Sequence, residues 1–307
     1  MIEQNKYLVC VRCYTFNQAN YIVDALNGFT MQKTSFPFIC TILDDASTDG
    51  EQEVLSKYLD DNFSLDDTST YRREETNDYI MVFAQHKNNH NCFFAVYYLK
   101  YNHYRIKKSK LDYIAEWSDA KYIATCEGDD YWFDRSKLQD QVDFMEQHPE
   151  HSLCFCSHRN KYSNGNVNEV IRYPNDVECC PMKDAIHCGG AYMATASMLY
   201  RTDMAENRPQ WSLGLPIGDL PLMLVLMGRG KCGYINRVMV CYRVSSDGSW
   251  TNLMKKDKKR RLYLFSSVKR MYKEFDKWTK REYHSSIVKR CWEVNMYIIR
   301  LKLGILK

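Results

Sequence analysis

The 307-residue sequence contains no long apolar run. No stretch reaches the roughly 18–20 consecutive apolar residues that a membrane-spanning helix needs, and residues 1–6 form no apolar signal segment. Internal repeats and low-complexity tracts are also missing. With 45% hydrophobic and 26% charged residues, the composition excludes disordered and fibrous proteins. We therefore expect a globular chain with a substantial core and without a membrane span.

The thirteen cysteines lack the spacing of a small disulfide-stapled domain. Cys10 and Cys13 form a C-x-x-C pair inside an apolar run, but no second Cys or His pair follows at zinc-site spacing. The eight histidines form no metal-ligand pattern either. We interpret the cysteines as reduced core residues, with metal or redox chemistry at the C-x-x-C pair as the alternative. Reduced thiols favour the cytoplasm.

The formal net charge of +4 conceals an uneven distribution. From Lys255 to Lys307 there are 17 Lys and Arg against 5 Asp and Glu, whereas residues 1–254 hold 25 against 33. Aromatic and aliphatic side chains alternate with the cations of this tail. The pattern predicts a helical hairpin that packs on the acidic body, and it leaves open a surface helix on the inner face of the cell membrane, bound to anionic lipid. Nucleic-acid binding is not expected, because no recognition motif accompanies the charge.

Short β-rich runs alternate with helical patterns along the first half of the chain. Strands are predicted at residues 7–14, 38–43, 79–84, 121–126, 153–157, 194–201 and 233–244, helices at 18–32, 51–59, 93–117, 134–148 and beyond 251, and a polar loop at 64–77. This alternation indicates an α/β fold with a largely parallel, doubly wound sheet, becoming more mixed after residue 152. Ligands of such sheets lie at the carboxyl ends of the strands.

Two of the predicted strands end in paired aspartates, Asp44-Asp45 and Asp129-Asp130. Adjacent carboxylates in a tight turn repel each other unless a cation lies between them. A hard divalent cation, Mn²⁺ or Mg²⁺, would take oxygen ligands from such carboxylates and from a nucleotide diphosphate. The alternative is a solvated turn in which an aspartate caps a helix. Glu127 before the second pair and aromatic residues after it favour a binding site.

These residues resemble motifs of a known enzyme family. Residues 126–132 (Cys-Glu-Gly-Asp-Asp-Tyr-Trp), followed by Asp134, Lys137 and Leu138, resemble the acidic motif of the family 2 glycosyltransferases. Residues 14–22 resemble the exit of that family's first strand. Residues 43–50 resemble the exit of its second strand, with Ala46 where the family usually has Gly. The three motifs stand in the family's order and together span residues 7–138.

The resemblance implies a GT-A fold over residues 1–250, with a mostly parallel central sheet flanked by helices, and a basic helical extension at 251–307. It also implies inverting transfer of a hexosyl or N-acetylhexosaminyl group from a nucleotide-diphosphate donor, commonly a UDP-sugar. The acceptor would be a hydroxyl of a saccharide or lipid-linked acceptor, as in bacterial polysaccharide synthesis. By the family's pattern, the nucleobase of the donor is bound by Asp45 and by the segment Tyr14, Thr15, Phe16 and Asn17. Asp129 lies near the ribose or the metal, and Asp130 ligates Mn²⁺ or Mg²⁺.

Residues 217–222 resemble the family's segment that carries the general base, which assigns this role to Asp219. The alternative is a plain helix N-cap, which is compatible with catalysis. Many relatives carry a metal-binding His in the loop that follows residues 241–243, whereas this chain has none, and Asp247 is a candidate replacement. Two other functions stay open: a sugar nucleotidyltransferase, disfavoured by the lack of a Gly-rich first loop with Arg and Lys, and an inactive nucleotide-sugar-binding protein.

Overall fold

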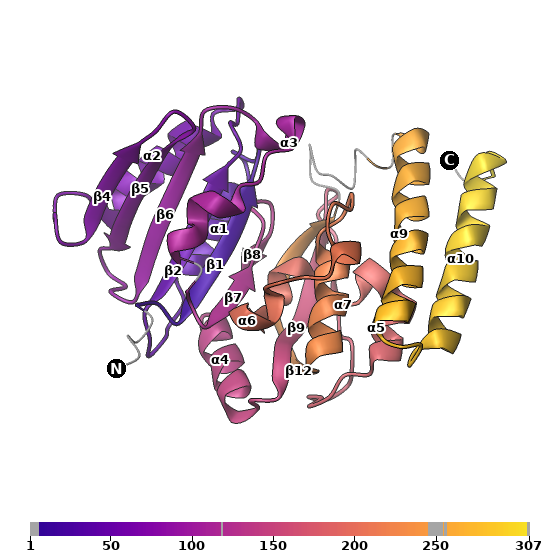
Figure 1. Cartoon of the computed structure of the whole chain (residues 1–307). Coiled ribbons are helices and arrows are strands. Elements are labelled where there is room, and N and C mark those ends of the chain that lie inside the picture. Colours follow the sequence, from indigo (N-terminus) through magenta and orange to yellow (C-terminus); the bar gives the residue numbers. More distant parts are fainter. Residues whose placement is uncertain (1–5, 118, 245–253, 255–256, 306–307) are drawn as a thin grey trace.

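The computed structural model describes residues 6–117, 119–244, 254 and 257–305 (Figure 1). The first half contains β1 (Val9–Thr15), α1 (Ile22–Thr30), β2 (Phe38–Asp44), α2 (Glu51–Asn62), β3 (Phe63–Ser64), β4 (Tyr71–Glu75), β5 (Tyr79–His86), β6 (Cys92–Leu99), α3 (His103–Ile106), the 3-10 helix η1 (Leu111–Trp117), β7 (Tyr122–Thr125), β8 (Tyr131–Trp132) and α4 (Lys137–Gln147). The second half contains β9 (His151–Tyr162), β10 (Val167–Val170), α5 (Met182–Cys188), η2 (Gly189–Ala191), η3 (Thr195–Ser197), β11 (Leu199–Arg201), α6 (Thr202–Ala205), η4 (Gln210–Ser212), α7 (Asp219–Arg229), β12 (Lys231–Val244), α9 (Lys258–Trp278) and α10 (His284–Lys302).

The strands form one mixed sheet in the order β3-β5-β6-β2-β1-β7-β11-β9-β12-β8. Its centre is parallel, because β2 pairs in parallel with β6 and with β1, and β1 pairs in parallel with β7. Beyond β7 the direction changes, since β11 runs antiparallel to both β7 and β9. The predicted α/β fold with a parallel sheet core is confirmed, and the second half is mixed as expected.

Two predicted elements are wrong, and a third, the strand at 194–201, is the 3-10 helix η3 followed by the short strand β11. Residues 92–99, predicted within a helical region, form the central strand β6, which pairs with β2 and β5. This run of Cys, Phe, Ala, Val, Tyr and Leu lies largely buried between two neighbouring strands, so its apolar pattern has no period that separates strand from helix. The polar loop predicted at 64–77 contains β4, an antiparallel edge strand with mostly exposed side chains.

Three clusters of buried side chains hold the fold together. Two of them cover opposite faces of the first half of the sheet, and β1 contributes to both. Successive strand residues face opposite sides, so Cys13 lies in one cluster and Cys10 in the other. These thiols therefore cannot share a metal ion. All thirteen cysteines are free, and ten of them are buried core residues, whereas Cys179 is exposed and Cys188 and Cys291 are half-buried.

The C-terminal helices form a hairpin at one end of the molecule, with α10 outermost (Figure 1). The third cluster lies in the second half of the fold and includes residues of α5, β9 and α7. Helix α9 packs into it through a stripe of buried residues spaced three and four apart: Leu264, Val268, Met271, Tyr272 and Phe275. The hairpin is therefore part of the packed body. Among the described residues, no helix is both long and apolar enough to cross a bilayer.

Candidate active site

The carboxyl ends of β1, β2 and β7 meet at one edge of the sheet. Thr15 at the end of β1 is in register with Asp44 at the end of β2, and β7 lies on the other side of β1. Backbone bonds extend this pairing beyond the strands, because Asp45 N donates to Thr15 O at 3.0 Å and Gly128 N donates to Tyr14 O at 3.2 Å. The three motifs predicted from the sequence thus converge on one place.

Gly128 is needed for this convergence. A Cβ atom at this position would overlap the Thr15 hydroxyl and the side-chain amide of Gln18. The absence of a side chain lets the turn after β7 lie directly against the exit of β1. This close approach fixes the position of the carboxylates on either side of the glycine.

Glu127, Asp129 and Asp130 form the centre of the site. One carboxylate oxygen from each lies within 4.8 Å of the others. Asp130 is 1% exposed, and its Oδ1 accepts a hydrogen bond from the backbone N of Arg243 at 2.8 Å. Its Oδ2 is buried and has no hydrogen-bond partner among the described residues. Three carboxylates around a buried, unpaired oxygen fit a hard divalent cation.

The electrostatics of this cluster favour uptake of positive charge. Burial, followed by the charge of Asp129, raises the pKa of Asp130 well above its usual range. Glu127 is exposed at the surface, but partial loss of hydration beside the surrounding protein, followed by the charges of Asp129 and Asp219, raises its pKa to about 8. A proton or a metal ion relieves this repulsion. Glu127 was noted in the sequence, but no role was assigned to it.

Arg243 at the end of β12 holds the acidic turn in place. Besides the bond from its backbone N to Asp130, its guanidinium donates to Asp129 O at 2.6 Å and forms an ion pair with Asp24. The same group lies over the rings of Tyr21 and Tyr131, at 5.0 and 4.7 Å from their centroids. The sequence motif 241–243 was seen, but nothing in it indicated this contact across the sheet.

Asp45, which is predicted to bind the nucleobase of the donor, is 2% exposed. Its Oδ1 accepts from His103 N at 2.7 Å, and its Oδ2 accepts from Tyr104 N at 3.2 Å and lies 3.0 Å from Lys110 Nζ. This carboxylate therefore anchors the start of α3. The Lys110 ammonium also lies over the Tyr14 ring, 5.6 Å from its centroid. The base-binding role of Asp45 stays a prediction, and Lys110 and the start of α3 are neighbours that the sequence did not indicate.

The other predicted base-binding residues line the exit of β1. Phe16 is the most exposed of them, at 36%. Asn17 has a left-handed backbone (φ 54°), and its Oδ1 accepts from Thr48 N at 2.8 Å, which ties this exit to the exit of β2. Thr15 donates its hydroxyl to Glu51, a buried residue at the start of α2. These contacts place the segment beside Asp45, and its role in nucleotide binding stays a prediction.

Asp219 is the first residue of α7, and its Oδ1 accepts from Leu220 N at 2.8 Å. Burial raises its pKa. Its charge in turn raises the pKa of Glu127, so the structure brings Asp219 within electrostatic reach of the acidic turn. The N-cap alternative is wrong, because Gly218 is the N-cap of α7, without a side-chain capping bond, and Asp219 is the first residue inside the helix. The catalytic role of Asp219 stays a prediction. The other sequence candidate, Asp247, lies outside the described residues, as does most of its loop.

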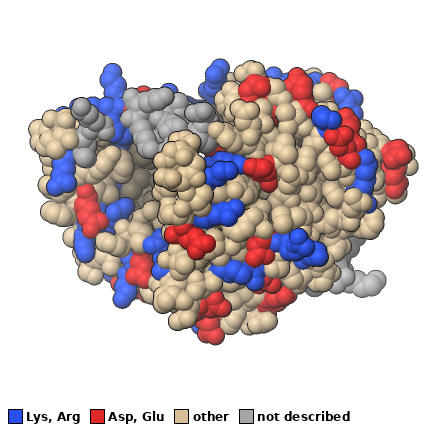
Figure 2. Space-filling view, turned by 180° about the vertical axis from the view of Figure 1, so that it is seen from behind, with Lys and Arg blue, Asp and Glu red and all other residues tan. Residues whose placement is uncertain are grey.

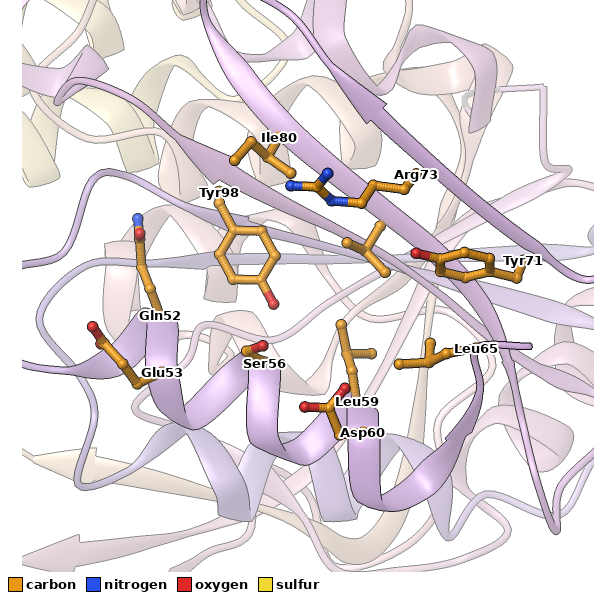
Figure 3. Close-up of a pocket in the computed structure, with 11 residues that line it drawn as sticks. Gln52, Glu53, Ser56, Leu59, Asp60, Leu65, Tyr71, Arg73, Ile80 and Tyr98 are labelled. Carbon is orange, nitrogen blue, oxygen red and sulfur yellow. The ribbon is translucent and has the colours of Figure 1, made fainter. Parts of the chain in front are cut away.

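A separate hollow of about 440 Å³ lies between α2 and strands β4 to β6 (Figure 3). Gln52 and Ser56 of α2 face Tyr71, Arg73 and Tyr98 across it. None of the residues predicted from the sequence as site residues lines this hollow. The candidate active site is therefore the strand-end cluster of carboxylates.

Comparison with solved structures bears on the fold. The chain has a GT-A-like fold. It resembles S. aureus TarS (residues 1–349) in complex with UDP-GlcNAc, with a TM-score of 0.55 and 14% identity, over 87% of this chain and 66% of that one. It also resembles the mannosyltransferase PcManGT of Pyrobaculum calidifontis in complex with GDP-Man and Mn²⁺, with a TM-score of 0.51 and 11% identity, over 95% and 74% of the two chains.

Sequence comparison finds relatives without an assigned role. No family model matches the sequence. Uncharacterized proteins of Mycobacterium tuberculosis and Mycobacterium bovis are 28% identical to the chain over 243 residues, covering 77% of it. The match spans 58% of the length of these relatives.

Proposed function

We propose that the protein is an inverting glycosyltransferase that moves a sugar from a nucleotide-diphosphate donor, a UDP-sugar, to a hydroxyl group of a saccharide or lipid-linked acceptor. The observation that carries the proposal is the trio Glu127, Asp129 and Asp130 at the joined ends of three parallel strands. Such strand ends are where α/β sheets bind nucleotides. The GT-A-like fold supports the same reading, and its structural neighbours are bound to UDP-GlcNAc or to GDP-Man.

The acidic trio would hold Mn²⁺ or Mg²⁺. The unpaired Oδ2 of Asp130 and the oxygens of Glu127 and Asp129 are hard donors of the kind that these ions prefer. When bound, the ion would neutralise charge on the leaving diphosphate. The sequence assigned the metal to Asp130 and the ribose or metal to Asp129. The geometry adds Glu127 to this set.

The remaining residues would bind the donor and activate the acceptor. Asp45 and the segment from Tyr14 to Asn17 would hold the base, with Phe16 as the exposed aromatic face. Asp219 would remove the proton from the acceptor hydroxyl as it attacks. Its raised pKa suits this task, because a stronger base accepts the proton more readily. The start of α7 would hold its carboxylate in a fixed direction.

We place this reaction in the cytoplasm, next to the membrane. The thirteen unpaired cysteines support a reducing compartment. The basic C-terminal segment supports contact with an anionic membrane surface, where lipid-linked acceptors would lie.

The test is a panel of nucleotide sugars incubated with the purified protein, with Mn²⁺ or with a chelator, followed by detection of the released nucleoside diphosphate. We expect release from one UDP-sugar, dependent on the metal and absent in Asp129→Asn. Asp143→Asn, at an exposed position on α4, is the matched control and should behave as the wild type. Metal-independent release, or full release by Asp129→Asn, would refute the assignment of the trio.

A further inference from the structure

Helix α10 has two apolar faces, and only one of them is covered. Its buried residues, Ile287, Val294, Ile298 and Leu301, follow helical spacing and face the body of the protein. Another set points to solvent: Val288, Trp292, Ile299 and Leu303, exposed by 52%, 63%, 39% and 69%. Their spacing of four, seven and four residues places them on one stripe of the helix.

Cations flank this outer stripe. Lys289, Arg300 and Lys302 are exposed on the same helix. The single acidic residue of α10, Glu293, is paired with Arg290 at 3.1 Å and lies near His187 of α5. The outer side of α10 is therefore apolar and positively charged. In the space-filling view this end of the molecule, on the left, is tan surface with both Lys and Arg and some Asp and Glu (Figure 2).

We propose that the outer stripe of α10 is a docking face for an anionic lipid bilayer, along which the helix lies parallel to the membrane. Apolar side chains centred on a Trp would enter the headgroup boundary, and the flanking cations would pair with lipid phosphates. This inference extends the membrane contact proposed above by naming the face that makes it. Its test involves no turnover, so its failure leaves the transfer reaction untouched.

The positive charge beside the outer stripe of α10 favours an anionic bilayer over a second copy of the chain as its binding partner. If two copies packed through this stripe, the cations of each α10 would face those of the other. Like charges brought together in this way oppose association. An anionic bilayer surface instead complements both the apolar stripe and the flanking cations of the helix.

The experiment is co-sedimentation of the full chain with vesicles of phosphatidylcholine alone or mixed with phosphatidylglycerol. We expect binding only to the mixed vesicles, and weaker binding as salt is raised. The double variant Trp292→Ser/Leu303→Ser should bind at least about tenfold more weakly. Lys289→Gln/Arg300→Gln should lose about fivefold for each removed cation.

Matched controls lie on the opposite half of the molecule or on β10. Lys33→Gln/Lys57→Gln removes the same charge from other exposed positions, and Val167→Ser removes an apolar side chain that is 53% exposed. Both should bind vesicles as the wild type does. The proposal is overturned if the wild type ignores mixed vesicles at low salt, if the controls weaken binding as much as the α10 variants, or if Trp292→Ser only dissociates a dimer without changing lipid binding.

Discussion

Replacing Asp130 by Asn should stabilise the metal-free protein while removing its response to metal. The Asp130 carboxylate is buried, and its Oδ2 has no hydrogen-bond partner among the described residues. The amide of Asn has nearly the same shape, keeps an oxygen for the backbone N of Arg243, and can donate to Glu127 or Asp129. Relief of an unsatisfied buried group is worth about 1–3 kcal/mol. For a chain of this size we expect the melting midpoint to rise by roughly 2–10 °C.

The gain should depend on pH with a definite sign. The pKa of Asp130 is raised above the value of 3.8 that an unperturbed aspartate has, so the folded state binds the proton more tightly than the unfolded state. The contribution of Asp130 to the free energy of unfolding of the wild type is therefore fully present below the pKa of the unfolded state, and it is lost as the pH rises through the higher pKa of the folded state. Glu127, with its pKa raised to about 8, adds to the same trend. The advantage of Asp130→Asn should therefore vanish near pH 3.8 and grow towards neutral pH.

The assay is thermal and chemical unfolding of both proteins in chelator and in Mn²⁺, across this pH range. Excess Mn²⁺ should stabilise the wild type, by about 2.7 kcal/mol at a hundred times its Kd, and should leave Asp130→Asn unchanged. Asp143→Asn, exposed on α4, controls for the loss of one negative charge. A destabilised Asp130→Asn in chelator, or an equal Mn²⁺ response in both proteins, would refute the reasoning that the buried oxygen is a metal ligand.

The other predictions concern separate parts of the site and the fold. Asp219→Asn should lower the rate of transfer about 10²–10⁴-fold with unchanged donor affinity, measured by turnover and calorimetry; a rate above a third of the wild type would contradict this. Ala46→Gly should stabilise the protein by about 1 kcal/mol in urea unfolding, because Ala46 has a left-handed backbone with φ 60°. Gly128→Ala should cost about 1–3 kcal/mol and weaken UDP binding, because the new methyl group meets Thr15. Met271→Ala on α9 should cost about 2–5 kcal/mol, and a neutral effect would show that the hairpin is not part of the core.

The sequence predicted that the residues of the candidate site lie close together in the fold. The strands ending in Asp44-Asp45 and in Asp129-Asp130 were predicted to belong to a largely parallel sheet, and parallel strands present their carboxyl ends at one edge. In the structure these two strands lie on either side of β1 and pair with it in parallel. The left-handed backbone at Ala46 also agrees with the family's usual Gly there. The role of Asp219 came from resemblance alone, because residues 213–218 before α7 carry no pattern that indicates a cleft.

What the sequence could not predict depends on contacts between distant segments. Strand β6 was missed because an apolar run buried between two strands lacks a period. Arg243 reaches the acidic turn only because β12 pairs with β8, and these strands are separated by about a hundred residues. Lys110 reaches Asp45 through a short helical segment whose path is set by tertiary packing. In each case the local pattern is compatible with several partners, and long-range pairing selects one.

The loss of stability caused by ionised carboxylates at the candidate site bears on the remaining alternative, an inactive nucleotide-sugar-binding protein. Loss of hydration raises the pKa of the buried Asp130, the exposed Glu127 and the half-buried Asp219, so ionisation of these groups disfavours the folded state, most strongly at Asp130. Neutral residues of similar shape would fit these positions at lower cost. Binding of a donor through a metal explains the first two, but Asp219 stands at the start of a different helix and has no part in that trio. A half-buried carboxylate on a separate element, within electrostatic reach of Glu127, suits removal of a proton from an acceptor. The arrangement therefore favours transfer over binding alone.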